Sequence, residues 1–382
     1  MSPFRRVLER TVLLGATVSM IAMNSYGVYA NSEPTESGRA EVMQALDAVV
    51  RAGVPGVQVV VSEQGRDWTA AAGVGDIATG ARFPDDGRVR IGSVTKSFTA
   101  TVLLQLVAEG KVELDVPVER YLPGVLPGNG NDSILVRNLL QHTSGLASHT
   151  DLPAPETGEI LNRWRRFDTA DLVRRVLALP PHFAPGAQAE YNNINYLIAG
   201  LVIERVTGQP VDVAITRRII EPLGLQATYY PAAGETALRG PHPSGYLEFS
   251  NQHIEYTDMD TSLYGAAGAM VSTGAEVNRF FTALLGGKLL PQAQLDEMKR
   301  SLVPLTNRNN RPYGLGLAPR SVSCGKEVWG SSGTVPGFTT YNGVTSDGRA
   351  VVVTLNQTAV DSSPHTDNAM MKAFETAMCA AS

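Results

Sequence analysis

The chain has 382 residues, of which 43% are hydrophobic and 18% are charged, and its net charge is −5. This composition is typical of a globular protein, and the acidic balance argues against a nucleic-acid or acidic-membrane partner. The length fits one large domain or two interleaved lobes.

Residues 1–30 have the pattern of an export signal. Arginines precede an apolar run at 11–23, which is short for a membrane span, and small residues end at Ala30. We expect cleavage near Ala30, a secreted protein and no membrane partner afterwards. The arginine pair at 5–6 leaves the twin-arginine route open, and an anchor helix is the alternative interpretation. Without these residues the net charge is −7.

The first elements after the signal are predicted from hydrophobic spacing. Apolar residues at 42, 46 and 49 indicate an amphipathic helix. Residues 57–61 and 68–72 flank a Gln-Gly pair and predict a β-hairpin. The segment 73–78 has the letters of a dinucleotide fingerprint, but no helix follows, so we interpret its glycines as turn residues.

The stretch 90–110 predicts a helix that begins near Ser93 and ends at Gly110. Ser93 and Lys96 lie three residues apart and therefore share a face near the first turn. A hydroxyl at a helix start, with an amine one turn away, is a candidate activated nucleophile. A second Ser-x-x-Lys, at 323–326, includes a glycine and runs into a strand, so we expect no helix to bring its Ser and Lys together.

Helical patterns alternate with Pro- and Gly-rich loops from 111 to about 264, where strand signals are sparse. Strand patterns then return, and a helix is expected at 367–378. The predicted strands are 313–317, 326–329, 338–344 and 351–355, the last two joined by an Asp-Gly turn.

Strands at both ends of the chain with a helical block between them predict an α/β fold with two lobes. We expect a discontinuous α/β lobe made of 31–92 and 265–382, and a helical lobe made of 93–264. The active site is expected between the two lobes.

Two further segments carry candidate site residues. Tyr191 and Asn193 lie two apart in an extended segment and so point the same way, where they could flank a nucleophile. A structural Tyr with a capping Asn is the alternative. The small residues of 330–337 could offer backbone N–H groups to an oxyanion, or could form a tight edge strand. The candidates for substrate contact there are Ser331, Ser332 and Thr334.

No metal or cofactor is expected, because the six histidines are scattered and there is no cysteine cluster. His142 could act as a general base, although a satisfied loop histidine is the favoured interpretation. Cys324 and Cys379 could form one disulfide in an oxidising compartment, or could remain two buried thiols.

The order of these motifs resembles that of the penicillin-recognising serine enzymes, and most of all the secreted D-alanyl-D-alanine carboxypeptidases and class C β-lactamases. The resemblance rests on 93–96, 191–193 and the strand near 331, with further similarity at 139–146 and 313–317. It covers nearly all of the chain after the signal. It implies an antiparallel sheet flanked by helices with an inserted all-helical lobe.

The resemblance also implies roles. Ser93 would be the nucleophile that forms an acyl-enzyme, and Lys96 would help to remove its proton. Tyr191 would relay a proton to the leaving group, and which of Lys96 and Tyr191 is the true base stays open. Asn193 would orient Lys96. The N–H groups of Ser93 and Thr334 would form the oxyanion hole.

Other positions agree with or depart from the resembled pattern. Cys324 and Cys379 match a family disulfide. The third motif usually begins with Lys or His, where this chain has Ser331, and carboxypeptidases carry an Arg where it has Ala318. Both missing groups help to bind a terminal carboxylate, so we expect poor discrimination for the free acid unless Arg320 takes the place of a lost cation.

Three functions remain. The first is a serine acyl-enzyme hydrolase or acyltransferase most like a D-alanyl-D-alanine carboxypeptidase. The second is an esterase or transacylase acting on a neutral substrate, with water or an amine as acceptor. The third is a β-lactam-binding protein that is acylated without turnover. In each case we expect a small-molecule or peptide substrate, no cofactor and a monomer.

Overall fold

The computed structural model describes residues 35–126, 133–153, 162–250, 252–359 and 364–381. The predicted export signal at 1–30 and its cleavage site lie outside the described residues. In the described ranges, no helix has both the length and the apolar character to span a membrane.

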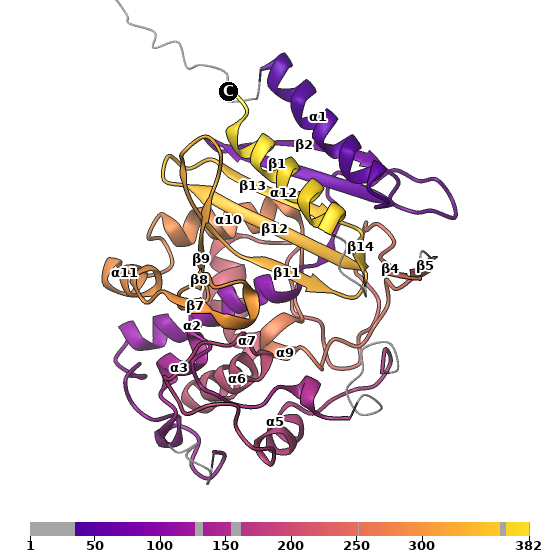
Figure 1. The fold of residues 1–382 in the computed structure, drawn as a ribbon. Helices are drawn as coiled ribbons and strands as arrows, with labels where there is room; N and C mark the ends of the chain where they lie inside the picture. Colours follow the sequence, from indigo (N-terminus) through magenta and orange to yellow (C-terminus); the bar gives the residue numbers. More distant parts are fainter. Residues whose placement is uncertain (1–34, 127–132, 154–161, 251, 360–363, 382) are drawn as a thin grey trace, which may run out of the picture. The chain divides into compact units, whose positions relative to one another are not determined.

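The largest element is a seven-stranded sheet in the order β2-β1-β13-β12-β10-β9, with β11 paired to β12 (Figure 1). Every pairing in it is antiparallel. Its members are β1 (Gly56–Glu63), β2 (Arg66–Gly73), β9 (Ala318–Ser321), β10 (Glu327–Gly330), β11 (Ser332–Val335), β12 (Phe338–Thr345) and β13 (Ala350–Leu355).

The two faces of this sheet belong to two hydrophobic cores. Val351 and Val353 of β13 pack into one core, and Val352, between them, packs into the other. This alternation follows from the two-residue period of a strand. The covering helices are α1 (Glu36–Arg51) and α12 (Pro364–Cys379) on the first face and α10 (Gly274–Leu285) on the second.

A group of helices lies beyond the second face, around α2. Most of the side chains of α2 are buried, because its apolar residues continue around the helix instead of forming one stripe. The helix that carries Lys96 is therefore fixed on all sides. The helices are α2 (Thr95–Ala108), α3 (Val136–Leu140), α5 (Thr169–Leu177), α6 (Asn193–Thr207), α7 (Val211–Ile215), α8 (Glu221–Leu223), α9 (Gly265–Gly268) and α11 (Gln292–Arg300).

Shorter strands form three small sheets outside the main one. None of these three sheets was predicted from the sequence, and only the two strands at 246–255 lie in the stretch from 111 to about 264 where strand signals are sparse. The pairs are β3 (Val89–Arg90) with β6 (Val271–Ser272) and β7 (Val303–Leu305) with β8 (Arg311–Tyr313), and the third sheet joins β4 (Tyr246–Phe249), β5 (Gln252–Glu255) and β14 (Gln357–Ala359).

The prediction of a strand over 313–317 is wrong beyond its first residue. The Gly314 N–H donates to the Leu317 carbonyl at 2.7 Å, which closes a turn, and Gly316 has a φ of 83°. A side chain at Gly316 would meet Ala100 and the Lys96 carbonyl. The glycines therefore allow this buried turn to pack against α2.

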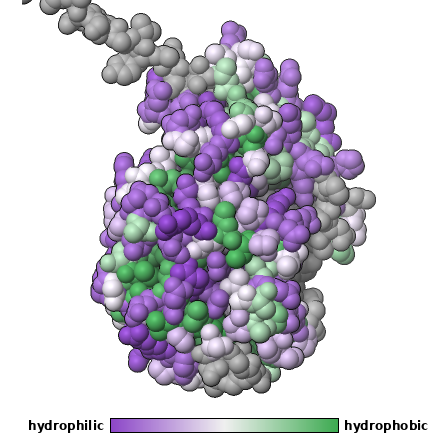
Figure 2. Space-filling model, turned by 60° about the vertical axis from the view of Figure 1, so that its left-hand side comes forward, coloured by the Kyte–Doolittle hydropathy of each residue, from purple (hydrophilic) through white to green (hydrophobic). Residues whose placement is uncertain are grey.

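The fold class predicted from the sequence is confirmed: the protein has an antiparallel sheet flanked by helices, with further helices beside it. The division into 31–92 with 265–382 and 93–264 stays a prediction. On the face drawn in Figure 2, hydrophilic side chains separate the hydrophobic ones into small groups. This is the ordinary pattern of a folded surface.

Candidate active site

Ser93 lies in a 3₁₀ turn, Gly92–Val94, that leads directly into α2. Lys96 follows in the first turn of that helix and is fully buried. The Lys96 Nζ lies 2.9 Å from the Ser93 Oγ. The structure therefore brings the predicted nucleophile and its amine into direct contact.

Two carbonyl oxygens complete the surroundings of the Lys96 amine. Its Nζ donates to the Asn193 Oδ1 at 2.7 Å and to the Ala267 carbonyl at 2.8 Å. A neutral amine has two N–H donors and one lone pair. A protonated Lys96 would donate to the Ser93 Oγ, whereas a neutral Lys96 that donates to both carbonyls would turn its lone pair to the Ser93 hydroxyl, as a general base requires.

The pKa values of the two candidate bases are shifted apart. Burial lowers the pKa of Lys96 well below its usual 10.5, and the nearby Arg308 charge lowers it further. Burial raises the pKa of Tyr191 to about 12, although its hydroxyl is hydrogen-bonded to Ser93. These opposite shifts favour Lys96 as the group that accepts a proton and Tyr191 as the group that donates one.

Asn193 is the first residue of α6, and its place is set by the residue before it. The Asn192 side chain accepts from the Ile194 N–H at 3.0 Å and caps the helix. It also donates to the carbonyls of Leu146 and Ala147, at 2.8 and 3.0 Å. The capping Asn is therefore Asn192, which leaves Asn193 free to orient Lys96.

The backbone of strand β11 packs directly against the backbone around Ser93, with no side chain between them. A Cβ at Gly333 would lie 1.8 Å from the Ile91 carbonyl oxygen and 2.8 Å from the Ser93 nitrogen. A Cβ at Gly92 would lie 2.8 Å from the Thr334 nitrogen. This close approach brings the N–H groups of Ser93 and Thr334 near each other, in the arrangement expected of an oxyanion hole.

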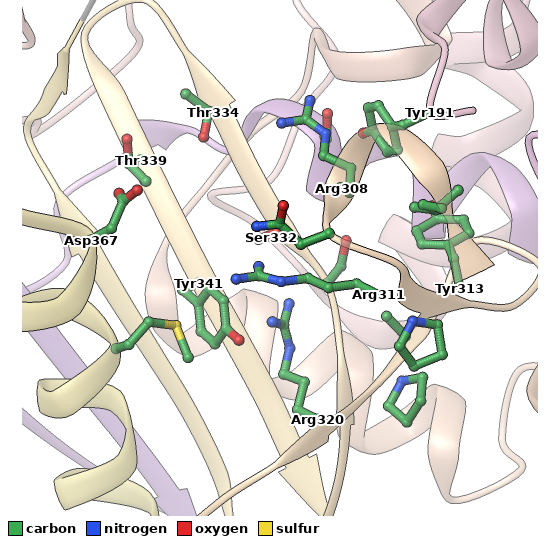
Figure 3. A pocket seen from close by; sticks show the side chains of 18 of the residues that line it. Tyr191, Arg308, Arg311, Tyr313, Arg320, Ser332, Thr334, Thr339, Tyr341 and Asp367 are labelled. Atoms are coloured by element: carbon green, nitrogen blue, oxygen red, sulfur yellow. The ribbon is translucent and has the colours of Figure 1, made fainter. Parts of the chain in front are cut away.

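A cavity of about 1250 Å³ opens in front of Ser93 (Figure 3). Its wall contains each of the predicted substrate-contact positions. Ser332 and Thr334 are exposed on β11, whereas Ser331 is buried and its N–H donates to the Asn342 Oδ1 at 2.9 Å. The predicted residues in the wall are Ser93, Tyr191, Asn193, Arg320, Ser331, Ser332 and Thr334.

Three arginines line this cavity: Arg308, Arg311 and Arg320. Figure 3 shows the Arg311 and Arg320 guanidinium groups beside Tyr341 and that of Arg308 toward Tyr191. The Arg320 group lies 3.6 Å from the Tyr341 ring centre, and its buried Nε has no hydrogen-bond partner in the part of the chain that the structure describes. The absence of cations at 318 and 331 therefore does not leave the cavity without positive charge.

His142 lies behind Tyr191 instead of beside Ser93. Its Nδ1 accepts from the Asn192 N–H at 3.2 Å and is also 3.2 Å from the Asn195 Nδ2. Burial lowers the pKa of His142 well below its usual value, so the ring is neutral. His142 is therefore a loop histidine behind the site, as favoured, but it is only half satisfied, because its buried Nε2 has no hydrogen-bond partner among the described residues.

The second Ser-x-x-Lys has no such arrangement. Ser323 is exposed in a turn before β10, and Lys326 lies 3.2 Å from Asp347. Next to it, Cys324 and Cys379 form a disulfide, as predicted, between this turn and the end of α12. Within the described ranges, no three His, Cys, Asp or Glu side chains gather where they could hold a metal ion.

Sequence reasoning missed Arg308, Arg311 and the Ala267 carbonyl. Arg308 lies in the segment between β7 and β8, at 306–310, which carries no motif of its own, and Arg311 is the first residue of β8. The Ala267 carbonyl belongs to the backbone of the short helix α9 and leaves no trace in side-chain identity. The two consecutive asparagines in 306–310 were the available signal, because Asn tolerates the left-handed region that a sharp turn needs.

The fold and the Ser93–Lys96–Tyr191 centre together define the class of penicillin-recognising serine enzymes. The Beta-lactamase family model matches residues 40–374, which is most of the chain. The protein belongs to the beta-lactamase family.

Three individual proteins illustrate the similarity. A D-stereospecific amidohydrolase from Streptomyces sp. is 39% identical, with a TM-score of 0.78, over 87% of this chain and 98% of that one. The D-amino acid amidase of Ochrobactrum anthropi SV3 is 28% identical, with a TM-score of 0.77, over 89% and 98%. Esterase EstB of Burkholderia gladioli is 31% identical over 50% of this chain and 51% of its own length. Matches to the first curated relatives span 51 to 62% of those proteins.

Proposed function

We propose that this protein is a serine hydrolase that cleaves amide or ester bonds of D-configured acyl donors through an acyl-enzyme on Ser93. The observation that carries the proposal is the contact of Ser93 with a buried Lys96, with Tyr191 on the same hydroxyl. The opposite shifts of the two pKa values supply a base and an acid at one nucleophile.

The reaction follows from these contacts. Lys96 takes the Ser93 proton while the Ser93 Oγ forms a bond to the substrate carbonyl carbon. The N–H groups of Ser93 and Thr334 stabilise the oxyanion. The bond to the leaving group then breaks as Tyr191 gives the departing nitrogen or oxygen a proton, and Tyr191 recovers one from Lys96. Water attacks the acyl-enzyme in the same way and releases the acid and free Ser93.

The D-configuration of the acyl donor is supported by similarity. Two solved structures aligned over 98% of their own chains are titled as a D-stereospecific amidohydrolase and a D-amino acid amidase. The Ser93 centre described above offers the chemistry that such amide cleavage needs.

The arginines support a carboxylate on the substrate, as in a D-alanyl-D-alanine carboxypeptidase. Arg308 lies 5.0 Å from the ring centre of Tyr191, the residue assigned to the leaving group, so positive charge gathers on that side. Arg320 lies in the wall of the same cavity and adds a further positive charge there. A peptide ending in a free D-residue would meet these groups, and Arg320 would then take the place of the cations absent at 318 and 331.

A neutral ester or amide is the second candidate substrate, favoured by Ser331 and Ala318 and by the similarity to Esterase EstB. Acylation without turnover is the least supported, since the groups for deacylation are present. We also propose export guided by residues 1–30, a secreted monomer, and no nucleic-acid or membrane partner, on the charge and the signal pattern.

The test compares kcat/KM on N-acetyl-D-Ala-D-Ala, its terminal amide, and the peptide with an L-residue as acyl donor. We expect the D-acyl donor to be preferred, and the free acid to exceed the amide by about tenfold or more, because a charge-assisted contact is worth at least about 1.4 kcal/mol. Preference for the L-acyl donor would contradict the proposal.

Arg320→Met should remove the preference for the acid while leaving cleavage of the amide. Arg300→Met is the matched control, since Arg300 is an exposed residue of α11 paired with Glu297. Equal rates on acid and amide in the unaltered protein would instead favour the neutral substrate.

A further inference from the structure

The segment that carries Tyr191 is extended but belongs to no β-ladder in the described chain. Its backbone is nevertheless hydrogen-bonded on alternating sides. Glu190 and Asn192 donate their N–H groups to His142, at 2.9 Å to the carbonyl and 3.2 Å to Nδ1. The backbone N–H and C=O groups of the odd-numbered residues point to the opposite side, because these groups alternate in direction from one residue to the next along an extended chain.

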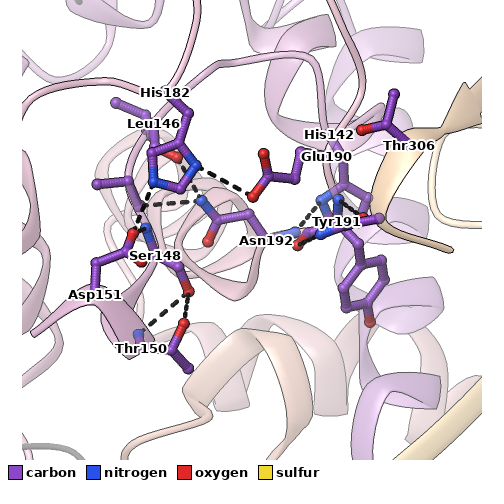
Figure 4. A network of polar contacts seen from close by, with 12 residues as sticks. His142, Leu146, Ser148, Thr150, Asp151, His182, Glu190, Tyr191, Asn192 and Thr306 are labelled. Atoms are coloured by element: carbon purple, nitrogen blue, oxygen red, sulfur yellow. Dashed lines mark hydrogen bonds and ion pairs between the residues drawn. The ribbon is translucent and has the colours of Figure 1, made fainter. Parts of the chain in front are cut away.

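That opposite side is held by Thr306 and Asn307, which follow β7. The Thr306 N–H and hydroxyl both donate to the Ala189 carbonyl, at 2.8 and 2.9 Å. Figure 4 shows Thr306 next to this segment, with His142, Asn192 and Tyr191. Four consecutive residues are thus fixed from two elements that are distant in sequence.

Asn307 makes the closest connection to the site. The Tyr191 N–H donates to the Asn307 Oδ1 at 2.8 Å, and the Asn307 Nδ2 donates to the Tyr191 carbonyl at 3.1 Å. A primary amide presents a donor and an acceptor side by side, so one side chain satisfies both backbone groups of the catalytic tyrosine, as a neighbouring strand would.

The turn after Asn307 has an unusual backbone. Asn309 and Asn310 both have a φ of 54°, and two consecutive non-glycine residues in the left-handed region are uncommon. Such conformations persist where the surrounding structure requires them, and they cluster at functional sites. Here the turn allows the chain to present Asn307 to Tyr191 and still return to β8.

We infer that Asn307 is a positioning residue of the reaction: its side-chain amide fixes the Tyr191 backbone and so keeps the Tyr191 hydroxyl at Ser93 for protonation of the leaving group. The inference rests on the proposed Ser93 chemistry. It adds a residue that lies in the wall of the same cavity and whose side-chain hydrogen bonds, among the described residues, go to the Tyr191 backbone. Misplacement of a catalytic group by about 1 Å can cost about 10²-fold in rate.

The test uses two substrates that form the same acyl-enzyme, N-acetyl-D-alanine p-nitroanilide and N-acetyl-D-alanine p-nitrophenyl ester. The anilide nitrogen needs a proton to depart, whereas p-nitrophenolate leaves without one. Asn307→Leu should therefore lower kcat/KM on the anilide about 10²-fold and on the ester by less than about 5-fold. Asn310→Gly is the matched control, because Asn310 lies in the same turn and, among the described residues, its side chain neither forms a hydrogen bond nor lines the cavity. It should change neither rate.

Asn307→Asp provides a second variant and a rescue, and it carries the test if Asn307→Leu does not fold. The carboxylate can accept from the Tyr191 N–H but repels the Tyr191 carbonyl, and protonation restores a donor beside an acceptor. Its anilide rate relative to the unaltered protein should therefore rise as the pH falls. Equal losses on both substrates, or no loss, would overturn the inference. Lack of D-preference with a retained anilide effect would count against the proposed substrate alone.

Discussion

We expect Gly333 to be essential because there is no room for a side chain at this position, and not because of its backbone conformation. Its φ is not positive, so alanine fits the strand geometry. The added Cβ, however, would lie 1.8 Å from the Ile91 carbonyl oxygen, where ordinary contact begins at 3.4 Å. Strand β11 would have to move by about 1.6 Å, the difference between those two distances, and the Thr334 N–H would move with it.

Loss of one oxyanion donor costs about 10²–10³-fold in kcat, and we expect Gly333→Ala to lose that much. The assay is kcat on the D-configured amide, with thermal unfolding measured alongside. Gly348→Ala is the matched control. Gly348 has a φ of 90° in a hairpin turn, and a Cβ added there would meet no described atom within 4 Å. It should cost about 1–2 kcal/mol of stability and leave kcat unchanged. A Gly333→Ala protein with normal kcat would refute the assignment of this oxyanion hole.

Three further predictions concern stability and pH. Replacing Cys324 and Cys379 with serine should lower the free energy of unfolding, measured by urea titration, by about 4 kcal/mol, because the disulfide closes a loop with a sequence separation of 55. Alkylation of both cysteines in the native, unreduced protein would contradict the bond. The rate kcat/KM should rise with pH as Lys96, whose pKa is lowered, loses its proton, and should fall as Tyr191, with a pKa of about 12, ionises. A rate that does not change with pH would count against Lys96 as the base and Tyr191 as the acid. Lys96→Met should be inactive yet more stable at pH 7, because Lys96 binds a proton in the unfolded chain that its lowered pKa excludes in the folded chain. This gain in the free energy of unfolding should fade as the pH rises toward the usual lysine pKa of 10.5. A variant that is less stable than the unaltered protein at pH 7 would contradict this sign.

The proposed nucleophile and its proposed base could be predicted from the sequence because their geometry is local. Ser93 and Lys96 are one helical turn apart, and any helix over that stretch brings them together. Tyr191 and Asn193 were identified through the order of the motifs, and the structure places both beside Lys96. The disulfide was similarly accessible, since the chain has two cysteines.

The positions of residues that depend on turns could not be predicted from the sequence. The alternation at 313–317 imitates a strand, but Gly316, with a φ of 83°, turns the chain onto α2. Arg308 and Arg311 enter the cavity because Asn309 and Asn310 reverse the chain between them. Neither arginine belongs to a periodic pattern, so only the folded backbone shows that both line the cavity in front of Ser93.

The proposed function requires that Ser93 forms the acyl-enzyme. Peptide mass spectrometry after brief reaction with an activated D-acyl ester or a β-lactam tests this directly. We expect one added acyl mass on the peptide that contains Ser93, no adduct in Ser93→Ala, and loss of turnover in that variant while it remains folded. An adduct on the peptide that contains Ser323, or full turnover by Ser93→Ala, would contradict it.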